Sequence, residues 1–176
     1  MVELRSTRGC VNTPRILMAL EEMGVGYRVE VVPDGTFSTR HGIPGPELLE
    51  GKHVLVEVGA ILRHVARRYG AGTLWPADLI GQAQVDRWLD FQAVRMARAA
   101  AGRDLETLGV LLAVLERHVT AHEWILDRGF TLADLGFVPA MVKRDKFPLA
   151  SFPAIAAYFD RLGARPSWKN ALASTP

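Results

Sequence analysis

Residues 2–32, VELRSTRGCVNTPRILMALEEMGVGYRVEVV, predict a strand, a helix and a second strand in that order. Residues 2–5 are short and β-compatible, and the apolar residues after the Thr-Arg-Gly break recur at helical spacings of three and four. Pro14 stands just inside the start of this helix and Gly24 just past its end, where helix boundaries favour these residues. Residues 27–32 are typical of a second strand. A β-α-β unit of this kind builds parallel sheet.

Outward from this unit, the pattern predicts a loop, a hairpin and another helix. Residues 33–46 show no steady period and carry prolines and glycines near both ends, so we expect mainly loop there. Residues 47–50 and 52–56 flank Gly51, as two antiparallel strands joined by a tight turn would. Residues 59–69 have helical apolar spacing and end before a glycine. The predicted order of the first half is therefore β-α-β-loop-β-β-α.

The second half is predicted to be helical throughout. From Leu79 onward the apolar residues recur at helical spacing, and the preceding residues 71–77 contain the Gly, Trp and Pro of a connector. We therefore predict two domains, a mixed α/β domain of residues 1–72 and an all-helical domain of residues 78–176.

Composition narrows the function classes. The 176 residues are 49% hydrophobic and 23% charged, as in an ordinary soluble domain. The net charge of +2 is spread over the chain, which makes nucleic acid a poor candidate partner. Charged residues interrupt every apolar run before the roughly 20 residues of a membrane helix, so we expect no membrane partner. A single cysteine excludes an internal disulfide and fits a reducing compartment, and we expect a cytoplasmic protein.

Four stretches, taken in order, resemble the cytosolic glutathione transferases along nearly the whole chain. They are residues 46–51 (PELLEG) with 57–62 (EVGAIL), residues 74–76 (LWP) with 87–90 (RWLD), residues 130–134 (FTLAD), and residues 152–168 (FPAIAAYFDRLGARPSW). In the third stretch, Thr131 and Asp134 form a capping box that starts a helix, which is a folding device independent of any family. The resemblance implies a thioredoxin-like N-terminal domain and a helical C-terminal domain. It also implies glutathione as co-substrate and a homodimer.

Cys10 is the catalytic residue that the resemblance implies, because serine and cysteine classes of the family keep their sulfur-contacting residue at this place. A thiol near a helix N-terminus meets partial positive charge and unpaired N–H groups, which favour its thiolate, and Arg8 would act in the same direction. The alternative is that Cys10 is a small buried hydrophobe. Ser6, Thr7 and Thr13 are the alternative hydroxyls for contact with the sulfur.

The residues predicted to bind glutathione follow from the same comparison. Pro46 matches the family's cis-proline, and Gly45 before it would offer its backbone to the cysteinyl part. Glu57 matches the acid that meets the γ-glutamyl end, and the alternative is that it caps the following helix. Val58 replaces a hydroxyl residue, which leaves the helix N–H groups to bind a carboxylate. His53 would face either the tripeptide or solvent.

Two shortenings set the chain apart from the family. The loop of residues 33–45 is short, and Pro44 occupies the place of a residue that normally donates to glutathione. Possible substitutes are Arg40, His41 and Lys52. The second shortening lies between residues 90 and 105, where the family's helices wall the electrophile pocket.

Cations and imidazoles in the second half give weaker signals. Arg95 or Arg98 could hold an anionic substrate, although solvated helix arginines are commoner. His118, His122 and Glu123 share a helix at suggestive spacing, but such residues are more often solvated, and we predict no metal.

Two hypotheses follow. The first is an enzyme that binds glutathione and transfers it to, or exchanges thiols with, a small electrophilic or disulfide substrate at the domain cleft. The second is a binding or dimerisation module of the same fold with weakened glutathione binding. Cys10, Pro46 and Glu57 favour the enzyme, whereas Val58 and the short loops favour the module.

Overall fold

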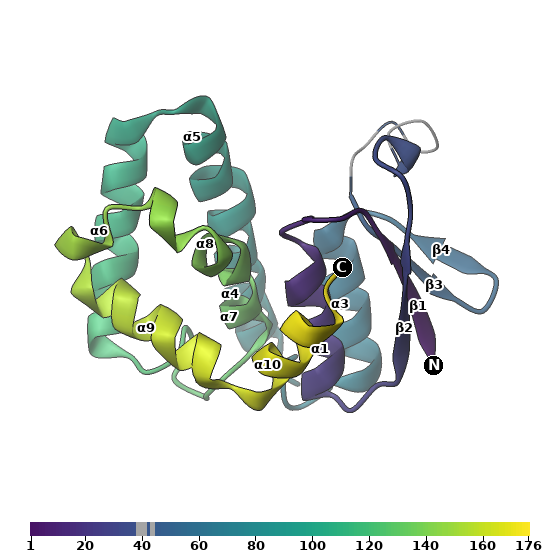
Figure 1. The fold of residues 1–176 in the computed structure, drawn as a ribbon. Helices are drawn as coiled ribbons and strands as arrows, with labels where there is room; N and C mark the ends of the chain where they lie inside the picture. Colours follow the sequence, from purple (N-terminus) through teal and green to yellow (C-terminus); the bar gives the residue numbers. More distant parts are fainter. Residues whose placement is uncertain (38–41, 43–44) are drawn as a thin grey trace. The chain divides into compact units, whose positions relative to one another are not determined.

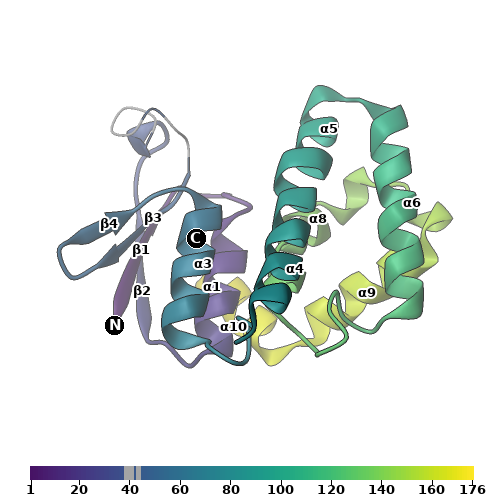
Figure 2. The ribbon, with the colours of Figure 1, turned by 180° about the vertical axis from the view of Figure 1, so that it is seen from behind.

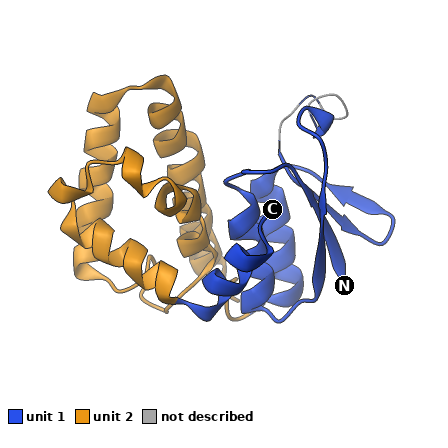
Figure 3. Ribbon diagram, viewed as in Figure 1, with its two compact units in different colours: residues 1–71, 165–176 blue, residues 72–164 orange. Residues whose placement is uncertain are grey.

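The computed structural model describes residues 1–37, 42 and 45–176, which form two compact units. The first unit contains residues 1–71 and 165–176, and the second contains residues 72–164 (Figure 3). Within these ranges no helix is both long and apolar enough to cross a membrane.

A four-stranded mixed sheet forms the centre of the first unit. The strands are β1 (Val2–Ser6), β2 (Tyr27–Val31), β3 (Glu47–Glu50) and β4 (His53–Leu55), in the order β2-β1-β3-β4. β1 pairs parallel with β2 and antiparallel with β3, and β3 pairs antiparallel with β4. The β-α-β opening and the hairpin predicted from the sequence are therefore confirmed.

The sheet has one apolar and one charged face, because side chains alternate along a strand. In β1, Val2 and Leu4 are buried, whereas Glu3 and Arg5 point the other way. Arg5 Nε lies 2.6 Å from Glu30 Oε2 on the neighbouring strand. The helices of the unit cover the apolar face.

Those helices are α1 (Thr13–Glu22) and α3 (Val58–Tyr69), which lie side by side on the sheet in both views (Figures 1 and 2). Every residue of α1 from Thr13 to Leu20 is buried, so this helix is the centre of the core. A third helix, α10 (Pro166–Ser174), packs against α1. The Arg165 guanidinium holds both carboxylate oxygens of Glu22, at 2.7 and 2.8 Å.

Because α10 packs back against α1, the compact units do not coincide with the domains predicted from the sequence. The division into residues 1–72 and 78–176 stays a prediction, and the units depart from it at residues 165–176. These residues belong with the first unit because α10 packs against α1, with Ser167 and Ala171 buried.

Helices are the regular secondary structure of the second unit in the residues that the structure describes, with a non-helical segment at residues 122–131. Its α-helices are α4 (Leu79–Asp90), α5 (Ala97–Gly102), α6 (Leu105–Ala121), α7 (Leu132–Leu135), α8 (Val138–Val142) and α9 (Pro153–Ala164). One π-helical segment, Phe91–Met96, connects α4 directly to α5, and short 3₁₀ turns separate α8 from α9. The predicted α/β-then-helical order is confirmed.

The predicted capping box begins α7. The backbone N–H of Thr131 donates to Asp134 Oδ2 at 2.8 Å. Asp134 Oδ1 accepts from the backbone N–H of Ile125 at 2.9 Å and from the hydroxyl of Tyr158 at 3.0 Å. The buried carboxylate therefore joins the start of α7 to a preceding loop and to α9.

Candidate functional site

Strand direction brings the starts of α1 and α3 to one end of the sheet. β1 and β4 run the same way, because each is antiparallel to β3. α1 follows β1 and α3 follows β4, so both helices begin at the carboxyl ends of these strands (Figure 1). β3 begins at this same end. The fold thus gathers Cys10, the Gly45-Pro46 pair and the Glu57-Val58 pair at one end of the first unit.

Cys10 lies in the turn between β1 and α1. Its backbone N–H donates to the carbonyl of Thr7 at 3.4 Å, and its own carbonyl accepts from the N–H of Thr13 at 3.1 Å. Gly9 has φ +69°, a conformation that favours glycine, and its N–H donates to the carbonyl of Pro176 at 3.4 Å. The thiol is free and only partly buried. The alternative of a sealed core cysteine is therefore wrong.

Two of the three alternative hydroxyls are occupied elsewhere. Ser6 and Thr13 are fully buried, and their hydroxyls hydrogen-bond to each other. Burial and mutual pairing remove both from contact with a ligand at the helix start. Thr7 is partly exposed and remains the alternative hydroxyl.

The start of α1 carries positive charge and no side-chain cap. The N-cap residue, Asn12, makes no side-chain capping bond. Burial lowers the pKa of Arg15 to about 10, while the charge of Cys10 acts in the opposite direction. The buried guanidinium of Arg15 therefore interacts electrostatically with Cys10. The sequence pattern indicates the exposed Arg8 and not the buried Arg15, whose only signal in the sequence is a charge within an apolar helix.

The Gly45-Pro46 pair corrects the prediction of a cis-proline. Among the described residues no peptide bond is cis, so the bond between Gly45 and Pro46 is trans. Gly45 has φ +156°, which other residues rarely adopt, and this glycine conformation turns the chain into β3. Pro46 is buried at the entrance of that strand. The prediction failed because it assigned to the proline a turn that the glycine makes.

Glu57 adopts a strained backbone at the start of α3. Its φ of 66° and ψ of 111° place a non-glycine residue in a sparsely populated region, at a cost of about 1–3 kcal/mol. Its exposed side chain makes no capping bond, so the alternative capping role is wrong. Val58 turns inward and is 9% exposed. The first N–H groups of α3 consequently have no side-chain cap.

His53 lies at the other end of its strand. It pairs in register with Glu50 across the hairpin turn, whereas Leu55 leads toward α3. His53 and Lys52 are both exposed at this turn, so the fold does not bring them to Cys10. The predictions for Arg40, His41 and Pro44 lie outside the described residues.

The charged candidates of the second unit show no built site of their own. Arg95 and Arg98 are both exposed on the π-helical segment and α5. In the described part of the chain, no group of three or more His, Cys, Asp or Glu side chains could hold a metal ion.

Comparison with known proteins gives relatives along the whole chain. Glutathione S-transferase 3 of Zea mays is 27% identical over 203 residues, covering 94% of this chain and 90% of that protein. The solved structure of Ure2p in complex with glutathione matches with a TM-score of 0.82 and 21% identity, covering 98% of this chain and 93% of that one. The chain is glutathione S-transferase-like.

Not every relative carries transferase in its name. Probable elongation factor 1-gamma 1 of Arabidopsis thaliana is 26% identical over 205 residues, covering 96% of this chain. This glutathione S-transferase-like chain spans 48% of that factor's length. No family model matches the chain. The fold is therefore shared by proteins whose names assign them different roles.

Proposed function

We propose that the first unit binds glutathione at the carboxyl end of its sheet and that Cys10 exchanges thiols with it. The observation that carries the proposal is the pair of helix starts, α1 and α3, that lack a side-chain cap at one end of the sheet. Uncapped N–H groups bind anions. Those of α3 would bind a carboxylate of the γ-glutamyl end, and the positive end of the α1 dipole would attract the glutathione sulfur as a thiolate.

Glu57 and Gly45 complete this assignment. The exposed carboxylate of Glu57 has the charge to bind the γ-glutamyl ammonium, and backbone strain at a ligand contact is a recurring feature of binding sites. Gly45 precedes β3 and would offer its backbone to the cysteinyl part, a contact that does not require a cis bond.

Thiol exchange uses two balanced displacements. The Cys10 thiolate attacks the glutathionyl sulfur of a small mixed disulfide, forms an S–S bond to glutathione and expels the substrate thiolate. The thiolate of a second glutathione then attacks this enzyme disulfide, which releases oxidised glutathione and restores the Cys10 thiolate. Glutathione is therefore the reductant, and two electrons pass to the substrate. Conjugation to an electrophile would need only a bound glutathione thiolate.

The binding step can be tested by thermal unfolding. Glutathione at one hundred times its dissociation constant should stabilise the fold by about 2.7 kcal/mol. S-methylglutathione, which keeps both ends of the tripeptide, should also stabilise it. The absence of a shift with millimolar concentrations of both compounds would exclude the proposed site.

The covalent step needs no peptide mapping, because Cys10 is the chain's only cysteine. Oxidised glutathione should add one glutathionyl group to the intact protein, and reduced glutathione should remove it. Cys10→Ser should retain the thermal shift with S-methylglutathione and lose the adduct. If the wild type binds glutathione without forming the adduct, conjugation becomes the better assignment.

A second candidate is a non-catalytic module of the same fold, supported by buried Val58 in place of a hydroxyl. The match to 48% of the length of an elongation factor relative is compatible with such a role. The resemblance also implies a homodimer, and sedimentation equilibrium would test it. A dimer that binds neither glutathione nor its S-methyl analogue would favour the module.

A further inference from the structure

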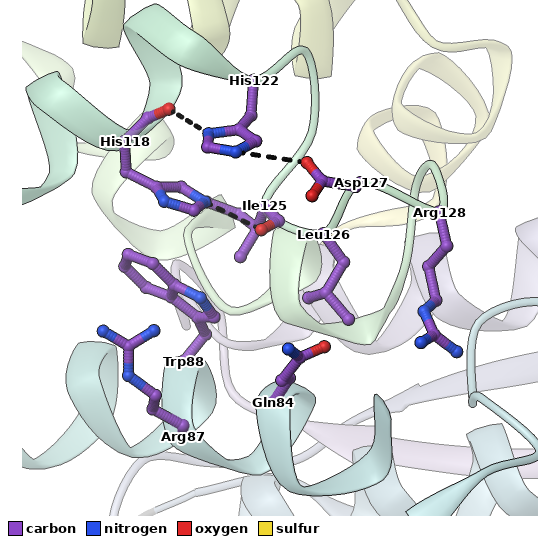
Figure 4. A pocket seen from close by; sticks show the side chains of 9 residues that line it. All are labelled: Gln84, Arg87, Trp88, His118, His122, Ile125, Leu126, Asp127 and Arg128. Atoms are coloured by element: carbon purple, nitrogen blue, oxygen red, sulfur yellow. Dashed lines mark hydrogen bonds and ion pairs between the residues drawn. The ribbon is translucent and has the colours of Figure 1, made fainter. Parts of the chain in front are cut away.

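The second unit contains a hollow of about 460 Å³ that the proposed glutathione chemistry does not use (Figure 4). Its walls come from α4, the end of α6 and the segment that follows α6. Pockets of this size hold small organic ligands. Every lining residue belongs to the second unit, so the hollow is built by that unit alone.

A stack of flat groups forms one wall. The guanidinium carbon of Arg87 lies 4.8 Å from the centre of the Trp88 ring. The ring of His118 lies 4.5 Å from that of Trp88, and the ring of His122 stacks on His118 at 4.4 Å with an interplanar angle of 18°. The Trp88 and His118 rings are tilted by 47°, so only the two imidazoles stack face to face. Rings in these arrangements suit contact with a planar aromatic ligand, which adds to the burial of apolar surface.

Hydrogen bonds hold both imidazoles in place. His122 Nδ1 lies 2.8 Å from the carbonyl oxygen of His118, and its Nε2 lies 3.2 Å from Asp127 Oδ1. Both of these nitrogens face acceptors. His118 Nε2 lies 2.8 Å from the carbonyl of Ile125. Burial lowers the pKa of His118, against the effect of this bond, and the charges of His122 and Arg87 lower it further.

Arg87 is the arginine of the hollow that is available to bind an anionic group of a ligand. Arg128 pairs with Asp78, and His122 pairs with Asp127. Arg87 is exposed, and its guanidinium forms neither an ion pair nor a hydrogen bond with any residue that the structure describes; this group contacts the Trp88 ring. A guanidinium offers two parallel N–H donors that match a carboxylate.

We propose that this hollow binds a small aromatic carboxylate, with the carboxylate on Arg87 and the ring along the imidazole stack. Buried Ile125 and Leu126 supply apolar surface to the same hollow. The exposed carboxylate of Asp127, which also lines the hollow, would repel a second negative charge on a ligand. A monoanion therefore fits better than a phosphate ester or a dicarboxylate.

Calorimetric titration with 2-naphthoate, and with 2-naphthamide as the uncharged analogue, tests the proposal on the full chain. The wild type should bind naphthoate, and naphthamide should bind about ten to one hundred times more weakly, as expected for loss of a charged hydrogen bond. Arg87→Gln should weaken naphthoate binding by a similar factor. Arg117→Gln, an exposed arginine on α6 outside the hollow, should leave it unchanged.

Imidazole proton resonances locate the ligand independently. Signals of His118 and His122 should shift with naphthoate along the same saturation curve. Cys10→Ser should bind naphthoate normally, which separates this site from the glutathione site. The proposal is overturned by the absence of naphthoate binding at millimolar concentration, by equal affinity of the two arginine variants, or by loss of binding in the Cys10 variant.

Discussion

The helices α1 and α7 begin in opposite ways. At α7, the Thr131 N–H binds a buried Asp134 carboxylate, which also accepts from Ile125 and Tyr158. At α1, Asn12 supplies no side-chain cap and Cys10 lies partly exposed in the preceding turn. One helix start is closed by its own side chains, whereas the other has no side-chain cap and its Thr13 N–H donates to the backbone carbonyl of Cys10.

This difference distinguishes a helix start that stabilises the fold, at α7, from one that is available for binding, at α1. A side-chain cap adds stability and occupies donors that a ligand could use, whereas a helix start without one keeps the positive end of the helix dipole available. The same contrast extends to other helices. Asp78 caps α4 and Asp104 caps α6 in the second unit, whereas α3 in the first unit begins uncapped at Glu57.

The largest effect is expected from removing the carboxylate that caps the start of α7. Asp134→Ala should lower the free energy of unfolding by about 3–5 kcal/mol, because it strands buried donors that the carboxylate now satisfies. Asp160→Ala, which removes an exposed ion pair with Arg144, should cost about 0.5 kcal/mol. Urea denaturation measures both. Equal losses would contradict a structural role for the capping box.

The pH dependence of stability should test the role of the buried Asp134 carboxyl group. Burial raises the pKa of Asp134 to about 6, against the hydrogen bonds from Ile125, Thr131 and Tyr158. The folded pKa lies above the unfolded value near 4, so the folded state binds more protons between them. The stabilisation that this pKa difference contributes is thus fully present below about pH 4 and is lost as the pH rises through about 6.

Asp134→Asn removes this titration. The difference in unfolding free energy between wild type and variant should fall by about 1 kcal/mol per pH unit across that interval. Parallel stability curves for the two proteins would show that the carboxyl group titrates identically in the folded and unfolded chains.

A smaller effect is expected at the strained start of α3. Glu57→Gly should be about 1–2 kcal/mol more stable than Glu57→Ala, because only glycine tolerates the positive φ without strain. Both variants should bind glutathione more weakly than the wild type, since both lack the carboxylate. Thermal unfolding with and without glutathione measures the two effects. Equal stability of the variants would argue against strain at Glu57.

The smallest effect is expected from placing a negative charge at the open start. Asn12→Asp should slow alkylation of Cys10 by iodoacetamide by about two- to fivefold, because a carboxylate at the helix N-terminus opposes the thiolate. Ala83→Asp adds the same charge to an exposed position of α4 and should leave the rate unchanged. An unchanged rate in Asn12→Asp would show that the electrostatic field of α1 does not affect the reactivity of Cys10.

Much of the fold could be predicted from local patterns. The strand and helix order followed from apolar periods, and the Thr131-Asp134 capping box followed from residue spacing. The conformation of the Gly45-Pro46 pair could not be predicted, because isomer and turn geometry depend on how the loop meets β3. Burial of Arg15 was also missed, since periodicity treats arginine as a surface residue.

The sequence alone determined the order of elements and placed Cys10 before α1, because both depend on residues close together in the chain. Only the tertiary structure decided that Glu57 joins Cys10 at one sheet end while His53 lies at the other. Strand direction sets this arrangement, and pairing between distant segments sets strand direction. The wall of Arg87, Trp88 and the two imidazoles likewise arises only when α4 and α6 pack together.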